Sequence, residues 1–151
     1  METIQRLDIE GARDTVEVDG VLGVFYKIRV GGKALKRGKG GWDIPMRKGA
    51  SSKLSARGLV PGFQKFYLDG EPIYAMGAYV DVAMRVLMFL PLVLIVLNPL
   101  VGLVLAVILF FMNVSVVKNP QMPRPVRIIL PIGNTLAGGL VLFLLAGLLR
   151  Q

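Results

Sequence analysis

Two long stretches of this sequence carry no charged side chain, one between Arg85 and Lys118 and the other between Arg127 and Arg150. The first contains an apolar run of 27 residues, Val86–Met112, and a helix needs about 20 apolar residues to cross a bilayer. The chain is 54% hydrophobic with a mean hydropathy of +0.60, and the excess is concentrated in these stretches. We therefore expect an integral protein of the plasma (inner) membrane.

Cysteine and histidine are both absent. Their absence excludes disulfides, thiolate chemistry, imidazole acid–base catalysis and the usual protein ligands of haem and copper. No acidic residue lies in the charge-free stretches, where a proton relay would need one. The nearest, Asp81, stands four residues before Arg85 and predicts a pair on one helix face. We expect no enzyme activity, no catalytic residue, no cofactor and no metal.

Basic residues outnumber acidic ones by 18 to 10, a formal net charge of +8. Much of this excess lies beside apolar segments, where each basic side chain is attracted to anionic head groups by about 1 kcal/mol. We therefore expect anionic lipids, and no nucleic acid, as partners of this charge. The candidate basic contacts with lipid or a protein partner are Lys36, Arg37, Lys39, Arg85, Lys118, Arg124 and Arg127.

Composition changes along the chain predict a small soluble β-domain followed by membrane helices. Residues 1–20 contain six acidic residues and no apolar run typical of an export signal, so we expect the β-domain in the cytoplasm. The expected segments are a polar lead-in (1–13), the β-domain (14–77), an interfacial helix (78–90), a first transmembrane helix (91–113), a proline-rich connector (114–127) and a second transmembrane helix (128–149).

The β-domain is predicted from its turn residues. Asp19-Gly20, Gly31-Gly32 and Asp69-Gly70 mark turns, since Asp and Gly tolerate positive φ, and they separate short alternating segments. An antiparallel sandwich or partial barrel is expected, with residues 47–58 as either an exposed loop or a polar strand pair. Its predicted core consists of Val24, Tyr26, Ile28, Val30, Trp42, Ile44, Leu54, Phe66, Leu68 and Ile73.

The first apolar run is interrupted by Pro91, Asn98-Pro99 and Gly102. We expect a span over residues 91–113 that is kinked at Pro99. The alternative is a re-entrant hairpin with Asn98-Pro99 at its tip and arms too short to cross, which needs protein or water around the tip. The sequence favours the kinked span.

The second span, residues 128–149, tolerates Pro131 near its first turn and follows a connector that three prolines make extended and stiff. Two spans place both termini on one side, so the C-terminus is expected in the cytoplasm with the β-domain. The three basic residues of the connector then lie outside, against the positive-inside tendency, whereas the re-entrant alternative returns them to the cytoplasm.

Small and amide side chains within the spans predict helix-packing surfaces. Interhelical amide hydrogen bonds contribute about 0.6–2 kcal/mol in lipid, and small residues let helix backbones approach closely. Contacts with the other span of this chain and contacts with another subunit are both open. The residues concerned are Asn98, Gly102, Gly133, Asn134, Ala137, Gly138 and Gly139.

Four features together carry a resemblance: the Asp69-Gly70 hairpin domain, the proline-interrupted span 86–112, the connector 118–125 and the glycine-rich span 128–149. By this layout the chain resembles small two-span accessory subunits of bacterial respiratory assemblies. The most similar in layout are those with a cytoplasmic β-domain in actinobacterial cytochrome bcc–aa3 supercomplexes. The resemblance implies a subunit that binds no haem or copper.

The function expected from these features is that of a non-catalytic structural or accessory subunit of a larger membrane complex, with other membrane subunits as partners. One alternative is a membrane-anchored regulatory module that recruits a soluble partner through its β-domain. A homo-oligomeric pore or transporter component is a further alternative.

Overall fold

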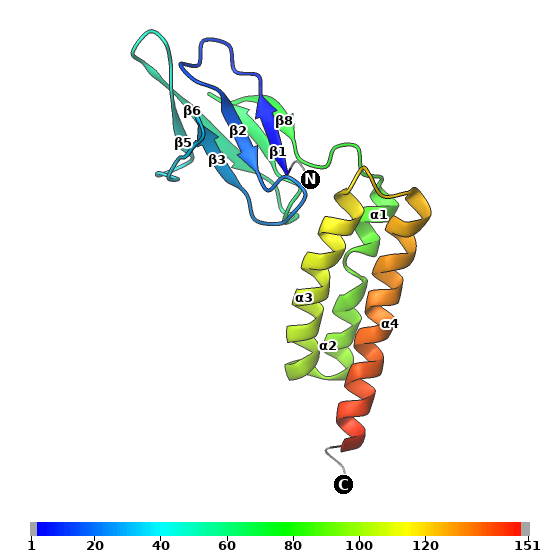
Figure 1. Ribbon diagram of the computed structural model, residues 1–151. Helices are drawn as coiled ribbons and strands as arrows, with labels where there is room; N and C mark the ends of the chain where they lie inside the picture. The colour runs from blue at the N-terminus through cyan, green and yellow to red at the C-terminus, as the bar shows by residue number, and fades with distance from the viewer. Residues whose placement is uncertain (1–2, 149–151) are drawn as a thin grey trace. The chain divides into compact units, whose positions relative to one another are not determined.

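The structure is a computed structural model that describes residues 3–148. The chain divides into two compact units, Met1–Ala78 and Tyr79–Gln151, which we call the β-unit and the helical unit (Figure 1). Each unit has its own architecture.

In its described part the β-unit contains two antiparallel sheets of four strands, each a meander in which consecutive strands are neighbours. The first sheet consists of β1 (Ile4–Leu7), β2 (Val16–Asp19), β3 (Lys27–Val30) and β4 (Lys33–Ala34). The second consists of β5 (Trp42–Pro45), β6 (Ser51–Arg57), β7 (Lys65–Leu68) and β8 (Glu71–Ala75). The predicted antiparallel β class is confirmed, although the two sheets do not close into a barrel.

The first strand lies where the sequence predicts a polar lead-in. β1 pairs antiparallel with β2 in a register that sets Leu7 opposite Val16. Of its four side chains only Leu7 is buried, so the strand shows no alternation by which a sequence pattern could reveal it. The strand therefore forms because its backbone pairs with the edge of β2, and its own side-chain pattern does not indicate it.

Two of the predicted turns form tight hairpins. Gly31 and Gly32 have φ of 54° and 77°, and Asp69 and Gly70 have φ of 49° and 97°. Two consecutive positive φ values are typical of the type I′ turn, whose twist matches that of the flanking strands. The Asp69 carboxylate also accepts a hydrogen bond from the Lys53 backbone N–H at 2.8 Å, which ties this turn to the neighbouring strand β6. By contrast, a longer connection, residues 20–26, follows Asp19.

The polar segment 47–58 forms a strand rather than a loop. Within it, β6 pairs with β5 on one side and β7 on the other. Its one core side chain, Leu54, is fully buried and lies opposite both Trp42 and Leu68.

Both sheets contribute to one hydrophobic core. Half of the predicted core residues are buried, namely Ile28, Trp42, Ile44, Leu54 and Phe66. Four more pack against them while partly exposed, namely Tyr26, Val30, Leu68 and Ile73. Val24 does not belong to the core, because it precedes β3 and lines a surface groove. The core also contains Leu7, Ile9, Val16, Val18 and Met76, which the sequence pattern does not predict.

The helical unit is a bundle of three antiparallel segments. The first, called the arm (Val82–Leu97), consists of α1 (Val82–Leu87), the 3-10 helix η1 (Leu90–Val93) and α2 (Leu94–Leu97). The second is α3 (Pro99–Lys118) and the third is α4 (Arg124–Leu148). In Figure 1 the arm runs away from Tyr79, α3 returns beside it, and α4 runs back again, with each segment packed on the other two.

The predicted kink at Pro99 is wrong, because the chain reverses its direction there. Asn98 has an extended backbone, with φ −152° and ψ 109°, and its side-chain oxygen accepts from the N–H groups of Leu100 and Val101 at 3.2 and 3.1 Å. Asparagine is a preferred N-cap, and proline suits the first helical position because it has no N–H to satisfy. Asn98-Pro99 begins α3 instead of bending it, as in the hairpin alternative.

The helix bounds differ from the predicted segments. The expected span 91–113 is divided between the arm and α3, and α3 continues to Lys118. The proline-rich segment 114–127 is therefore mostly helical, since only residues 119–123 lie between the two long helices. Pro125 stands in the first turn of α4, where a missing N–H removes no helical hydrogen bond.

The two ends of the bundle follow from these reversals. Tyr79 and the 119–123 turn lie at one end, while Asn98 and the last described turn of α4 lie at the other. The start of the arm and the last described turn of α4 therefore lie at opposite ends of the helical unit. Three antiparallel segments separate the end of α4 from the start of the arm, whereas two would bring them together.

Candidate functional site

Two helices, α3 and α4, are long and apolar enough to cross a membrane. Only 33% of the apolar window of α3 and 22% of that of α4 are buried inside the structure. The core helix of a water-soluble protein is mostly buried, so the exposed apolar surface of these helices favours a membrane location.

The end of the bundle near Tyr79 is held together by polar contacts, and we call it the polar end. The Tyr79 hydroxyl donates a hydrogen bond to the backbone oxygen of Lys118, which fastens the start of the arm to the end of α3. Arg124 pairs with Asp81 at 2.9 Å, which joins the start of the arm to the start of α4. Burial raises the pKa of Tyr79, although the nearby Arg127 guanidinium opposes the shift, so the hydroxyl stays protonated as a donor.

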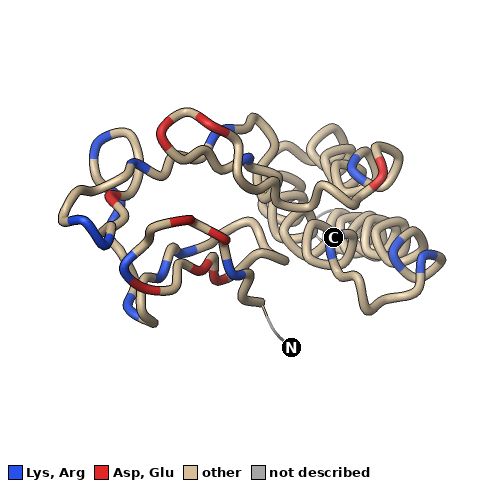
Figure 2. The backbone as a smooth tube through the Cα atoms, turned by 90° about the horizontal axis from the view of Figure 1, so that it is seen from above, with Lys and Arg blue, Asp and Glu red and all other residues tan. Residues whose placement is uncertain are grey.

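In its described part, residues 79–148, the helical unit carries charge only at this polar end. Residues 79–148 contain four basic side chains and one acidic one, a local charge of 4 − 1 = +3: Arg85, Lys118, Arg124, Arg127 and Asp81. Figure 2 looks down on this end of the helices. No charged residue of the described chain lies at the opposite end, around Asn98 and the last turn of α4. The four predicted basic contacts of this unit therefore share one end.

These basic side chains differ in exposure. Arg124 is exposed, while Lys118 is fully buried at the end of α3. Arg85 donates its Nε–H to the Val80 oxygen at 3.0 Å, and Arg127 donates to the Val117 oxygen at 3.5 Å. Arg124 is thus the most accessible of the four to a lipid head group.

The three basic candidates of the β-unit lie on an exposed loop between β4 and β5. The loop is closed at its tip, where the Gly38 N–H donates to the Gly41 oxygen at 2.8 Å. Lys36 and Lys39 are exposed, and the Arg37 guanidinium lies over the Trp42 ring at 5.2 Å from the ring centroid. The loop therefore presents its cations on a fixed turn beside an aromatic surface.

The predicted packing residues separate into two groups, of which one faces the interior of the bundle. A Cβ at Gly102 would lie 2.7 Å from the carbonyl carbon of Leu94 and closer still to its oxygen, so α3 and α2 meet backbone to backbone. A Cβ at Gly138 would lie 2.8 Å from both Leu94 and Leu109 side chains. Gly139 lies against Leu94 at an ordinary 3.8 Å, and Asn98 is used as the cap of α3. These residues pack within the chain.

The other group faces outward. A Cβ at Gly133 would meet nothing within 4 Å, and Ala137, one turn further along α4, is exposed. The buried residues of α4 lie on the opposite side of the helix, at Pro131, Thr135, Gly138 and Leu142. The sequence spacing does not separate these two faces, because each combines small residues with leucines.

Asn134 forms a polar contact inside the bundle with a residue that the sequence analysis overlooked. Its Nδ2 donates to the Oδ1 of Asn113 at 2.9 Å, across the α3–α4 interface. Asn113 is fully buried, and its own Nδ2 has no acceptor among the described residues. The amide that directly follows the first apolar run was the available signal, since buried amides in lipid seek one another.

Replacing Asn134 with alanine is expected to lower the free energy of unfolding by about 1 kcal/mol, because the buried Asn113 oxygen loses its donor. The double variant Asn113→Leu/Asn134→Leu should be less destabilised than this single variant, since it leaves no buried amide unpaired. Denaturant unfolding in mixed micelles, followed by circular dichroism, measures both. Equal losses for the two variants would contradict the pairing.

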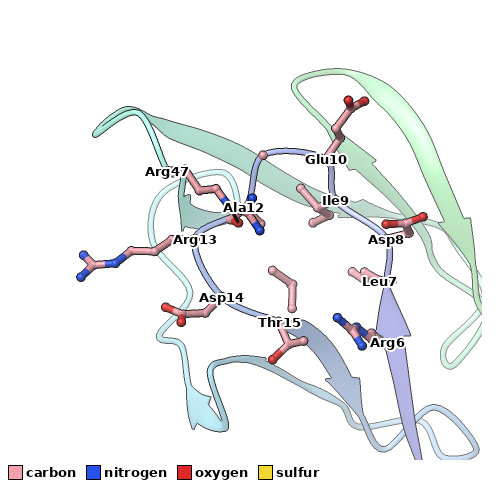
Figure 3. A pocket seen from close by; sticks show the side chains of 12 residues that line it. Arg6, Leu7, Asp8, Ile9, Glu10, Ala12, Arg13, Asp14, Thr15 and Arg47 are labelled. Carbon is pink, nitrogen blue, oxygen red and sulfur yellow. Dashed lines mark hydrogen bonds between the residues drawn. The ribbon is translucent and has the colours of Figure 1, made fainter.

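Figure 3 shows a surface depression of about 520 Å³ in the β-unit, formed by the loop between β1 and β2. The Arg13 N–H donates to the Pro45 oxygen and the Arg47 N–H to the Gly11 oxygen, both at 2.9 Å. Three basic and three acidic side chains line the depression: Arg6, Arg13, Arg47, Asp8, Glu10 and Asp14. The opposing charges cancel, so the depression has no preference for an anion or a cation.

Comparison with known proteins identifies no relative of this chain: no family model matches it, and neither curated proteins nor solved structures show significant similarity. Within residues 3–148, no group of three or more acidic side chains lies in an arrangement that could hold a metal ion.

Proposed function

We propose that this chain is a non-catalytic accessory subunit of a larger integral membrane complex. The helical unit is its anchor in the plasma membrane, and other membrane subunits are its partners. Respiratory assemblies of the cytochrome bcc–aa3 kind are the proposed class of complex, on the resemblance in layout alone.

The observation that carries this proposal is the outward face of α4. Gly133 and Ala137 leave a shallow strip on a helix whose other face already packs on α3 and the arm. Small residues four apart let a second helix approach closely in lipid, where van der Waals packing drives association. A helix from another subunit would fill this strip better than mobile acyl chains.

The charge distribution supports an orientation. Basic residues near membrane helices favour the cytoplasmic side, and the four within residues 79–148 all belong to the polar end. In the proposed orientation the polar end and the β-unit are cytoplasmic, while Asn98 and the last described turn of α4 are on the outer side. The positive-inside conflict of the two-span prediction then no longer applies to Lys118, Arg124 and Arg127.

Native electrophoresis of gently solubilised membranes, with mass spectrometry of the band that contains this chain, tests the proposal. Migration with a large hetero-oligomer is expected and would identify the complex. Migration at monomer size would contradict an accessory role, and a discrete homo-oligomer would favour a pore component.

The double variant Gly133→Leu/Ala137→Leu is expected to lose co-migration with the complex while it still inserts in the membrane. The control is Ser115→Leu, which adds one leucine at an exposed position of α3. Retention of the double variant in the complex would show that this face of α4 makes no contact with a partner.

A further inference from the structure

A second depression of the β-unit, a groove of about 630 Å³, differs in character from the one beside the β1–β2 loop. All of its charged side chains are basic, three others are aromatic, and the rest are aliphatic apart from Gln64. The basic ones are Lys27, Lys36 and Arg37, and the aromatic ones are Phe25, Tyr26 and Trp42. The charges of the first depression cancel, whereas all charged side chains of this groove are positive and together favour an anionic ligand.

The aromatic wall is held in place by the core. The Tyr26 ring packs edge-on against Phe66, with 5.3 Å between centroids, and lies 6.1 Å from the Trp42 ring. Trp42 and Phe66 are both buried core residues, so this wall cannot move independently of the sheets. Burial raises the pKa of Tyr26, against the opposing effect of Arg37, so its hydroxyl is uncharged and does not repel an anion.

Arg37 connects the basic side chains of the groove with its aromatic wall. Its guanidinium stacks over Trp42 while its donors stay free to face solvent, since the side chain is exposed. A stacked guanidinium is oriented in advance and binds a carboxylate through two parallel hydrogen bonds. Phe25, 76% exposed, adds an apolar surface next to these cations.

The groove borders the edge of a sheet. β4 is the last strand of the first sheet and pairs only with β3 among the described strands, and the groove is lined by Ala34 and the residues that follow it. An exposed edge can accept an added strand from another chain, and the flanking lysines would reject a neutral or basic one.

We propose that this groove binds an extended acidic segment of a partner protein. Its carboxylates would pair with Lys36 and Arg37, and its apolar side chains would lie on Phe25 and the accessible part of Tyr26. A peptide fits better than a lipid phosphate, because an edge strand recognises a backbone, which a phosphate lacks. The proposal concerns the β-unit and does not depend on the complex proposed for the helical unit.

The single tryptophan of the chain provides a direct measurement, because Trp42 is itself part of the groove. The purified full chain in nanodiscs of neutral lipid is titrated with a synthetic peptide that alternates glutamate and valine. Saturable change of the Trp42 fluorescence is expected, weakening as salt increases. The same peptide with lysine in place of glutamate should produce no saturable change.

Charge reversal localises the binding. Lys36→Glu/Arg37→Glu is expected to weaken the peptide affinity by at least about tenfold, since charge reversal removes two ion pairs and adds repulsion at the same positions. The matched control is Arg13→Glu/Lys48→Glu, which makes the same change in net charge at exposed positions that do not line the groove.

Three results would overturn the proposal: no saturable binding to the wild-type chain at low salt, equal weakening by the two double variants, or displacement of the peptide by anionic phosphatidylglycerol vesicles. The last would assign the groove to a lipid surface. All three are independent of native electrophoresis, so failure of the groove and failure of the accessory role are separable.

Discussion

The variant Gly102→Ala is expected to lose about 3 kcal/mol or more of the free energy of unfolding of the helical unit. The added Cβ would lie 2.7 Å from the Leu94 carbonyl carbon, which is backbone and cannot rotate away. The arm and α3 must therefore separate along their length. Denaturant unfolding in mixed micelles measures the loss, and limited proteolysis at the 119–123 turn should become faster.

Gly133→Ala is the matched control for this prediction. It makes the same substitution in a membrane helix at a position with nothing within 4 Å. It should leave the free energy of unfolding unchanged or raise it by up to about 1 kcal/mol, because alanine favours a helix more than glycine does. Equal stability of the two variants would show that the arm does not pack against α3 as described.

Labelling of single cysteines is expected to place the 119–123 turn on the same side of the membrane as the β-unit. The native chain has no cysteine, so each introduced thiol is unique. Gln121→Cys and Lys48→Cys should react with an impermeant maleimide from one face of sealed vesicles, and Leu148→Cys from the other. The effect is all or none, because the reagent does not cross the bilayer.

A protein with two spans gives the reverse pattern. Gln121 would then react from the side opposite Lys48, and Leu148 from the same side as Lys48. That outcome would contradict insertion of the three-segment bundle and restore the kinked span. Detergent-permeabilised vesicles, in which all three thiols react, control for accessibility.

The small residues of α4 that pack against other helices could be predicted from the sequence, but the direction in which each one faces could not. Gly133 and Gly138 have the same sequence signature, yet one faces outward and the other lies between Leu94 and Leu109. Which face of α4 is covered depends on where the arm lies, and the arm is distant in sequence. A substitution such as Gly138→Leu therefore tests the folding of this chain rather than its contact with a partner.

In the β-unit, too, some features could be predicted from the sequence and others depend on tertiary contacts. The sequence predicts the core positions of Trp42, Leu54 and Phe66, because apolar and polar residues alternate within each strand and this alternation is a local property. β1 escaped prediction because it contributes one buried side chain and is defined by its pairing with β2. The groove combines Arg37 and Trp42 with Tyr26, which directly precedes β3 of the other sheet, and strand patterns do not specify this juxtaposition.

The sequence by itself determined the local features: apolar helices of membrane-spanning length, the Asp69-Gly70 hairpin and the position of the basic residues. Each depends on the chemistry of neighbouring residues, such as positive φ in a turn or the cost of a charge in lipid. Only the tertiary structure decided that Asn98-Pro99 reverses the chain. The same dipeptide suits a kink or a helix start, and the close packing of Gly102 on Leu94 selects between them.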